Sequence, residues 1–307
     1  MSLKAVKNKI RSIGKIRQVT KAMEAVSAVK MRKSQQLALS SRPFAMSALS
    51  MLQRLSGTAE AKEHALITPR ASVRKRAVLL ITSDRGFSGA LNANALKCIY
   101  KLFKEASLTK ENTLLFFIGK KGATHFAARG WNIERNLDGW GEGVMEGDVR
   151  ALAEDFIIRY KNENFDELHI VYTNFVSSFA QEPVVRKALP ISPESVQELV
   201  DGIAPTMGKY SDTQTAHTEK AASTYLFEPS PSEVLDALIP YLLSVELYHA
   251  LLESNASEHS SRMIAMKNAS DRAGDMRKDL TREYNKERQG SITAEISEIT
   301  SGIEAMS

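Results

Sequence analysis

Apolar residues near the C-terminus recur with the spacing of a coiled coil. Residues 232–306 contain no proline after Pro240, which indicates one uninterrupted helix. A helix of this length would measure roughly 110 Å at 1.5 Å per residue, so it must extend beyond a globular body and bury one face against a partner. Steps of four and three residues relate Leu238, Leu242 and Val245, and again Ile292, Ile296, Ile299, Ile303 and Met306.

The first 56 residues have the same periodicity and predict the partner helix. Ile13 and Ile16 are three residues apart where four would keep the heptad phase, so we expect the supercoil to be disturbed there. Pro43 should kink or break the helix. Two apolar sets, each spaced by three, four and three residues, carry the pattern: Leu3, Val6, Ile10 and Ile13, then Ile16, Val19, Met23 and Val26.

In the middle of the chain, apolar runs of strand length alternate with helical segments. This alternation predicts a mainly parallel sheet flanked by helices. Strands covered on both faces are predicted at 77–82, 113–118 and 167–173, and shorter or weaker ones at 132–137, 184–191 and 224–227. Helices are predicted at 90–105, from 122 to about 129, and at 148–162. Residues 192–221, rich in Ser, Thr, Gly and Pro, predict a partly ordered loop with one short helix at 193–201.

These elements predict the fold class α/β, with a Rossmann-like, mainly parallel α/β domain plus a long antiparallel coiled coil formed by the N- and C-terminal helices. The predicted boundaries are 1–57 for the N-terminal coiled-coil helix, 76–228 for the α/β globular domain and 232–307 for the C-terminal coiled-coil helix. Antiparallel pairing should bring both chain ends to one tip.

The composition is that of an ordinary globular protein. Of 307 residues, 43% are hydrophobic and 25% charged, which leaves room for a sizeable core. No uninterrupted run of about 18 apolar residues occurs, so no membrane span is predicted. The N-terminus leads directly into charged residues without a signal-type apolar stretch. The single cysteine, Cys98, excludes an intrachain disulfide.

Positive charge is concentrated at the N-terminus. Residues 1–42 contain eleven Lys or Arg against one acid, Glu24, while the whole chain has a net charge of +5. A basic stripe of this kind suits nucleic acid, an anionic membrane surface or an acidic protein partner. The first aromatic residue is Phe44, so rings on which single-stranded bases could stack are absent from the stripe. Phosphate contact with duplex DNA stays open at this point.

Two turns that follow predicted strands, residues 83–89 and 119–122, could bind phosphate through backbone amides. Neither matches GxGxxG or GxxxxGK[ST], and we favour structural turns in which Asp84 and Arg85 satisfy local groups. The six histidines show no metal-ligand spacing, and no serine lies in GxSxG. The sequence therefore predicts no catalytic, cofactor-binding or metal site in this chain.

Five stretches together resemble the γ subunit, the central stalk, of the F-type rotary ATP synthase. They are residues 10–24 (IRSIGKIRQVTKAME), 82–92 (TSDRGFSGALN), 256–263 (ASEHSSRM), 284–289 (YNKERQ) and 292–295 (ITAE), followed by Glu298 and Gly302. Ile303 stands where the family usually has alanine, and Phe87-Ser88 where Leu-Cys is common. The resemblance covers nearly the whole chain and is weakest at 192–221.

The resemblance implies a non-catalytic rotor. The terminal helices would form a shaft inside a hexamer of three α and three β subunits, and the α/β domain would form a foot that contacts the ε subunit and the c-ring. The chain would couple proton or sodium flow through the c-ring to ATP synthesis or hydrolysis at the β-subunit sites. It would be peripheral to the membrane, without spanning it, at the cytoplasmic face of a bacterial inner membrane.

The same resemblance implies the residues of rotor–stator contact: Met23, Arg262, Gln289, Thr293, Glu295 and Glu298. An apolar tip of Ile299, Ile303 and Met306 beside Leu3 would slide in an apolar collar, and the basic stripe would face acidic loops of the β subunits. Two other classes stay open: an α/β nucleotide-binding enzyme with helical extensions, and a basic coiled-coil DNA-binding protein.

Overall fold

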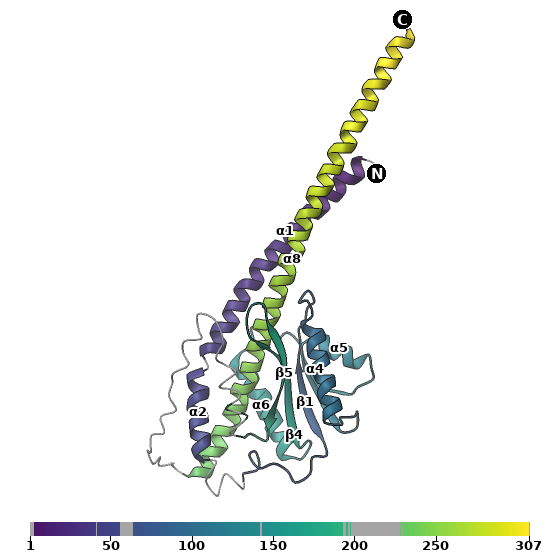
Figure 1. Ribbon diagram of the computed structural model, residues 1–307. Coiled ribbons are helices and arrows are strands. Elements are labelled where there is room, and N and C mark those ends of the chain that lie inside the picture. The colour runs from purple at the N-terminus through teal and green to yellow at the C-terminus, as the bar shows by residue number, and fades with distance from the viewer. Residues whose placement is uncertain are drawn as a thin grey trace. The chain divides into compact units, whose positions relative to one another are not determined.

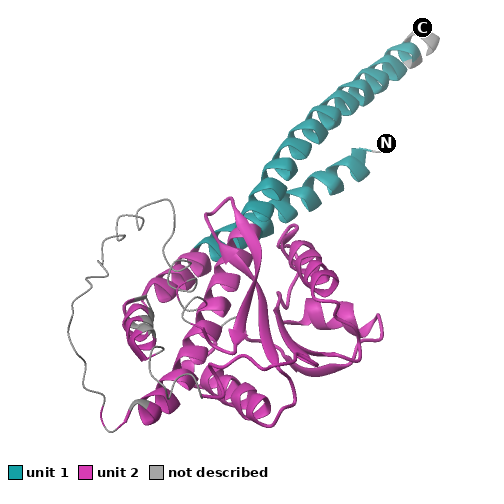
Figure 2. Cartoon of the chain, turned by 60° about the horizontal axis from the view of Figure 1, so that its bottom comes forward, with its two compact units in different colours: residues 1–28, 262–307 teal, residues 29–261 magenta. Residues whose placement is uncertain are grey.

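The computed structural model describes residues 3–40, 42–55, 64–141, 143–192, 195, 197, 228 and 230–306. Contacts divide the chain into two compact units, one formed by Met1–Ala28 with Arg262–Ser307 (unit 1) and the other by Val29–Ser261 (unit 2) (Figure 2). Each helix that forms unit 1 therefore also has a part in unit 2. The boundaries 1–57, 76–228 and 232–307 follow secondary structure rather than contacts, and they stay a prediction.

Unit 2 is built on a five-stranded sheet in the order β3-β2-β1-β4-β5 (Figure 1). Four strands are parallel, and β5 pairs antiparallel with β4. This confirms the predicted mainly parallel sheet. The strands are β1 (Arg76–Ile81), β2 (Thr113–Ile118), β3 (Ile133–Leu137), β4 (Glu167–Phe175) and β5 (Gln181–Leu189).

Helices cover both faces of the sheet and bury two apolar clusters. In β1, Val78 and Leu80 face a cluster with helices α4 (Leu91–Glu105) and α5 (Lys120–Ala127). The alternate residues of β1 face the opposite cluster, which includes helices α2 (Arg42–Leu55), α6 (Glu146–Lys161) and the first part of α8 (Pro231–Met306). Successive side chains of a strand point to opposite faces, so each run that is apolar throughout needs both layers.

The first part of α8 is a core helix rather than a coiled-coil strand. The predicted seam residue Leu242 is buried against the sheet together with Leu235, Leu243 and Leu247, so apolar side chains surround this part of the helix. The prediction of a coiled-coil seam there is therefore wrong. By length and composition α8 could cross a membrane, but 56% of its most apolar window is buried inside the protein, as expected for a core helix.

The predicted break at Pro43 is confirmed, because helix α1 (Leu3–Ser40) ends before it and α2 begins at Arg42. Proline lacks an amide hydrogen and clashes with the preceding turn, so it is tolerated near the start of a new helix. The strand predicted at 224–227 lies outside the described residues, as does nearly all of the helix predicted at 193–201.

In unit 1, the heptad of α1 continues without the predicted disturbance. Thr20 and Ser27 are 9% and 3% exposed, whereas Ile16, at 52%, faces outward. These two polar residues are seven apart and stay in phase with Val6 and Ile13. The seam therefore keeps the same heptad positions, which are polar at 20 and 27. The Thr20 hydroxyl donates to the Ile16 carbonyl at 3.0 Å, which satisfies this donor inside the seam.

Gly274 of α8 lies close to Arg17 of α1. A Cβ added to Gly274 would lie 3.4 Å from Nε of Arg17. From this pairing, Leu3 of an antiparallel α1 lies opposite about residue 288 of α8. The last turns of α8 therefore extend past the end of α1 as a single helix (Figure 2). The expected tip of Ile299, Ile303 and Met306 beside Leu3 is thus wrong, because α8 alone forms this end.

Two glycines of unit 2 give a matched test of the fold. Gly119 has a φ of 92°, and a Cβ there would overlap the Thr82 carbonyl oxygen, whereas a Cβ on Gly147 would meet nothing within 4 Å. We expect Gly119→Ala to destabilise the chain by several kcal/mol and Gly147→Ala to change stability by no more than about 1 kcal/mol. Urea unfolding of both variants measures this. Equal midpoints would contradict the close approach of α5 and β1.

Candidate interaction surface

The turn at 83–89 is organised by its own side chains. The two carboxylate oxygens of Asp84 accept hydrogen bonds from the amides of Lys120 (3.1 Å) and Gly139 (3.0 Å). The Ser83 hydroxyl donates to the Arg85 carbonyl at 2.7 Å. Asp84 thus ties together three loops at the carboxyl edge of the sheet, in agreement with the expected structural role of the turn.

The four amides of residues 119–122 all donate to acceptors within the chain. Gly119 bonds to the carbonyl of Leu137, Lys121 to that of Ser83, and Gly122 to the hydroxyl of Thr82, while Lys120 bonds to Asp84 as above. A phosphate bound at a helix N-terminus needs such amides to be free. The hydrogen bonds of this turn therefore hold α5 against β1 and leave no amide for a ligand.

The topological switch point of the sheet lies between β1 and β4, and in doubly wound folds this crevice binds the ligand. Here helix α8 contacts both sides of it. The Ser261 hydroxyl donates to the carbonyl of Ser88 after β1 at 2.6 Å, and the Ser257 hydroxyl to the carbonyl of Thr173 in β4 at 3.1 Å. The usual ligand position thus receives side chains of the protein itself.

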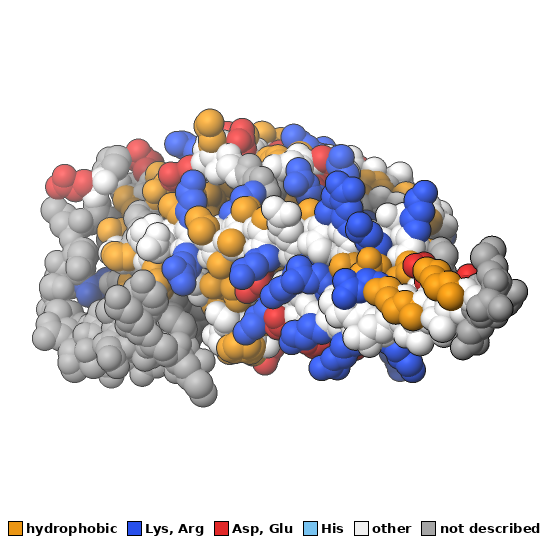
Figure 3. Space-filling model, turned by 90° about the horizontal axis from the view of Figure 1, so that it is seen from above, with side chains coloured by type: hydrophobic (Ala, Val, Ile, Leu, Met, Phe, Trp, Pro, Cys, Tyr) orange, Lys and Arg blue, Asp and Glu red, His pale blue; other side chains and the backbone are white. Residues whose placement is uncertain are grey.

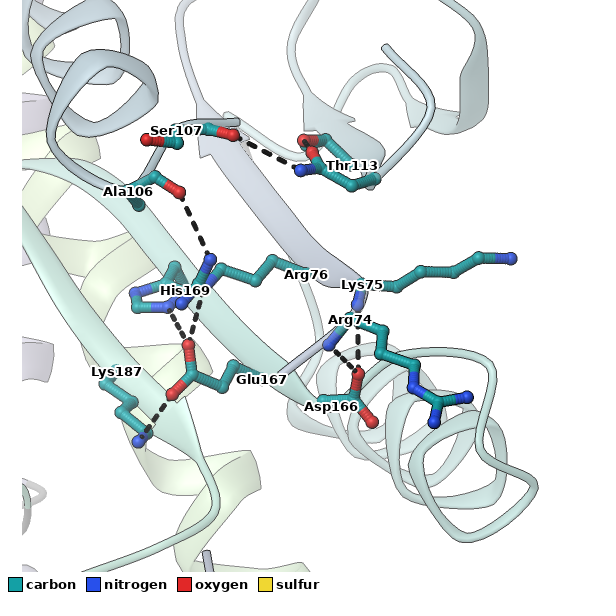
Figure 4. A network of polar contacts seen from close by, with 11 residues as sticks. Arg74, Lys75, Arg76, Ala106, Ser107, Thr113, Asp166, Glu167, His169 and Lys187 are labelled. Carbon is teal, nitrogen blue, oxygen red and sulfur yellow. Dashed lines mark hydrogen bonds and ion pairs between the residues drawn. The ribbon is translucent and has the colours of Figure 1, made fainter. Parts of the chain in front are cut away.

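A dense cluster of charged side chains lies at the opposite, amino edge of the sheet (Figure 4). Glu167 accepts hydrogen bonds from Nε of Arg76 (2.6 Å), Nζ of Lys187 (2.9 Å) and Nε2 of His169 (3.2 Å). Burial opposes its ionisation, but these three donors outweigh burial and lower the pKa of Glu167 to about 2. Burial also lowers the pKa of His169, which is therefore neutral at pH 7.

The neighbouring Asp166 holds the segment before β1 in place. Its carboxylate accepts the amides of Arg74 (2.7 Å) and Lys75 (2.9 Å) and one guanidinium nitrogen of Arg70 (3.0 Å). Although burial opposes ionisation, these bonds lower the pKa of Asp166. Because the cluster pairs its own charges and lies away from the carboxyl edge, it stabilises the fold rather than forming a reaction site.

A second polar group is buried between β4, β5 and α8. Burial lowers the pKa of His249 to about 3, aided by the positive charge of Arg186. Burial raises the pKa of Glu253 to about 7, although the Phe175 amide and Arg186 oppose it. The Phe175 amide donates to Glu253 at 2.7 Å. Within the described residues, no three His, Cys, Asp or Glu side chains are arranged to hold a metal ion.

All six residues expected at a rotor–stator contact lie in unit 1. Met23 is half-buried on α1 and Arg262 is 8% exposed on α8. The other four are exposed near the free end of α8, where the Thr293 hydroxyl donates to the Gln289 carbonyl at 2.9 Å. At 100° per residue, Gln289 and Thr293 share one side of the helix, and Glu295 and Glu298 lie on another. The structure therefore gathers the six into one unit but not into one cluster.

Two rows of apolar side chains are exposed, and among them only Ile299 and Ile303 were expected at a contact with another protein. On α1, Ile16, Val19 and Val26 are more than half exposed, and on α8 the row consists of Ile292, Ile296, Ile299 and Ile303, exposed by 46% to 64%. The spacing that reveals these rows was assigned to the coiled-coil seam. A contiguous exposed apolar row usually marks a contact with another protein. The free end of α8 is thus suited to docking rather than to chemistry.

Basic side chains accompany the apolar rows. Lys4, Lys7, Arg11, Lys15 and Lys21 of α1 are all exposed, and Lys and Arg are prominent in the view from above (Figure 3). Long basic side chains create a positive field that attracts acidic partners over about 8 Å at physiological salt. The surface therefore combines non-directional apolar contact with long-range positive charge.

Comparison with known proteins agrees with this picture. A protein-family model described as ATP synthase matches residues 2–306. The chain is 35% identical to the ATP synthase gamma chain of Roseiflexus castenholzii over 308 residues, covering 99% of this chain and 98% of that one. It is 36% identical to the ATP synthase gamma chain of Alkaliphilus metalliredigens over 306 residues, covering 100% and 99%.

Solved structures show the same fold. A chain of the mitochondrial ATP synthase of Euglena gracilis superposes with a TM-score of 0.63 at 18% identity, covering 99% of this chain and 94% of that chain. A chain from the central stalk and c-ring structure of Tetrahymena thermophila mitochondrial ATP synthase gives a TM-score of 0.58 at 21% identity, covering 82% and 99%.

The charged cluster of Figure 4 predicts a stability change with pH. The pKa of Glu167 falls from 4.5 to about 2 on folding, so its contribution is present above pH 4.5 and is lost as pH falls towards 2. We expect Glu167→Gln to cost roughly 2 kcal/mol at pH 7 and progressively less below pH 4.5. Urea unfolding from pH 7 to 3 measures the difference.

The matched control is Glu105→Gln, because Glu105 forms an exposed i,i+4 pair with Lys101. Its cost should stay under about 0.5 kcal/mol. If Glu167→Gln cost no more than this control at pH 7, the paired carboxylate would not stabilise the fold.

Proposed function

The chain belongs to the family of ATP synthase gamma chains, and we propose that it turns as the central rotor of an F-type ATP synthase. It couples proton or sodium flow through a c-ring to ATP synthesis or hydrolysis at the β subunits of a hexamer of three α and three β chains. The observation that carries this proposal is unit 1, in which α8 continues as a single exposed helix past the end of α1. A shaft that turns inside the hexamer needs an exposed end that the hexamer can surround.

The chain itself is a non-catalytic subunit. Two features of unit 2 support this: the amides of the turn at 119–122 are all used within the chain, and α8 contacts the switch-point crevice. The turn at 119–122 offers no free amides for phosphate, and side chains of α8 lie where α/β folds bind their ligand. The α/β unit is therefore a mechanical foot, and the nucleotide chemistry belongs to the β subunits.

An apolar shaft end can turn in its sleeve. Hydrogen bonds and salt bridges hold one angle, because they are directional, whereas apolar contact depends on buried area and changes little with angle. The exposed isoleucines at 292, 296, 299 and 303 offer such a surface. They slide in an apolar collar of the hexamer, so that the contact free energy has no single deep minimum as the shaft rotates.

The basic stripe transmits torque at longer range. Exposed lysines and arginines of α1 face acidic loops of the β subunits, and their attraction acts without one fixed pair. Each orientation of the asymmetric shaft contacts open and closed β conformations differently. A difference in contact free energy between two conformations shifts their populations, so rotation sets the three β sites to different affinities in turn.

The foot contacts the ε subunit and the c-ring, which places the chain at the cytoplasmic face of a bacterial inner membrane without spanning it. The apolar part of α8 is consistent with this, because it is packed in the core of unit 2. At the shaft, Met23, Arg262, Gln289, Thr293, Glu295 and Glu298 make the rotor–stator contacts. Four of them lie exposed on the free end of α8, where a sleeve reaches them.

Affinity purification from native membranes tests the assignment. We expect a tagged chain to bring down a nucleotide-binding hexamer and a c-ring. Micromolar nucleotide binding by the purified chain alone would instead support an α/β enzyme, and a steeply salt-dependent shift of duplex DNA would support a DNA-binding protein. Either result without the hexamer would overturn the rotor proposal.

Met23→Lys tests the shaft contact. Met23 is half-buried on α1, and a lysine there adds a charge that can form a directional bond with the sleeve. We expect ATP-driven ion pumping to fall several-fold more than ATP hydrolysis in the assembled enzyme, because a fixed bond hinders rotation and not bond cleavage. Fluorescence quenching in membrane vesicles and phosphate release measure the two rates.

Met23→Leu is the matched control, since it keeps an apolar side chain of similar volume. Both activities should stay near those of the unmodified enzyme. Unchanged pumping by Met23→Lys would remove this residue from the rotor–stator contact.

A further inference from the structure

Helix α8 changes its mode of contact with the sheet just before it leaves unit 2. Up to Leu251 its inward side chains are mainly apolar and join the core beneath the sheet. From Glu253 to Ser261 the contacts become hydrogen bonds to backbone groups of the α/β unit. Unit 2 ends at Ser261, so these bonds lie at the end of the part of α8 that belongs to unit 2.

Four side chains make these bonds from one face of the helix. Positions 253, 257, 260 and 261 are spaced by four, seven and eight residues from the first, which places them within about one third of the helix circumference. The contacts are the Phe175 amide to Glu253 at 2.7 Å, and the hydroxyls of Ser257, Ser260 and Ser261 to the carbonyls of Thr173 (3.1 Å), Ser178 (2.7 Å) and Ser88 (2.6 Å).

Their partners come from three separate segments at the carboxyl edge of the sheet. Thr173 and Phe175 belong to the end of β4, Ser178 to the β4–β5 turn, and Ser88 to the turn between β1 and α4. All four partners are backbone groups, whose positions are set by the sheet and its turns rather than by side-chain rotamers. Bonds to three segments fix both the position of the helix along its axis and its rotation about that axis.

Apolar packing alone would hold α8 less firmly against twisting. Burial of apolar area resists separation, but its free energy varies little when a helix turns slightly about its own axis. A hydrogen bond weakens steeply with angle and distance. Ser257 and Ser260 are fully buried, so water cannot replace a bond that a twist breaks.

We propose that Glu253, Ser257, Ser260 and Ser261 form the joint through which torque passes between the α/β unit and the shaft part of α8. The proposal rests on the rotor function proposed above and names the place where the foot grips the shaft. Two of the four, Ser257 and Ser261, bond to the two sides of the switch-point crevice, the position that a ligand takes in other doubly wound folds. These are positioning residues, remote from any bond that is made or broken.

The test measures the stiffness of the joint in the assembled enzyme. The hexamer is fixed to a surface, a bead is attached to the α/β unit, and the angular fluctuations of the stalled rotor are recorded. Ser257→Ala with Ser261→Ala should widen these fluctuations and reduce ion pumping against a gradient, while ATP hydrolysis stays unchanged. Angular fluctuations as narrow as those of the unmodified rotor would overturn the proposal that these residues form the joint.

Ser244→Ala is the matched control. Ser244 is a buried serine of the same helix, but its hydroxyl donates to the Pro240 carbonyl within α8 at 2.9 Å and not to the sheet. It should leave the fluctuations unchanged. An equal widening in Ser244→Ala would show that any lost buried hydroxyl softens the rotor, and the proposal would fail.

Single variants at Ser261 keep the test decisive if the double variant does not assemble. Ser261→Ala should widen the fluctuations, and Ser261→Thr, which retains the hydroxyl, should restore them. The same width in both variants would overturn the joint. If the unmodified enzyme binds the bead but does not turn with ATP, the rotor function itself fails, which distinguishes that failure from a loss of the joint alone.

Discussion

A single continuous helix performs two incompatible tasks, and the rest of the structure follows from that constraint. The first part of α8 must be apolar on several sides, because α2, α6 and the sheet surround it in unit 2. The last part must remain helical with little of its surface covered, as the exposure of Ile299 and Ile303 shows. An isolated helix is marginally stable in water, so the free end depends on the anchored parts and on partners outside the chain.

The coiled coil of unit 1 directs apolar side chains outward instead of maximising its own stability. Thr20 and Ser27 occupy the seam, while Ile16 and Val26 face outward. A conventional zipper would place them the other way round. Arg17 of α1 lies close to Gly274, and the outward apolar rows are then available to a sleeve. The coiled coil is therefore less stable than one with an apolar seam, but it presents an apolar surface that another protein can bind.

Much of the fold could be predicted from the sequence, because local pattern and final environment agree in the sheet. The run at 113–118 is apolar at nearly every position and became a strand with those bounds. The pattern was a poor guide to burial in the coiled coil. Thr20 is buried in the seam and Ile16 is exposed, so the buried positions follow the heptad spacing and not hydrophobicity. Ser257 and Ser261 gave no signal by spacing, because their partners are backbone groups distant in sequence.

Rotation of the chain relative to its hexamer is the measurement that tests this account most directly. The hexamer would be immobilised and a fluorescent marker attached to the α/β unit of the γ chain, and its angle would be followed while ATP is hydrolysed. The account predicts stepwise turning in one direction that stops when ATP is exhausted. A marker that keeps one angle while phosphate is still released would contradict it, because hydrolysis would then proceed without a moving shaft.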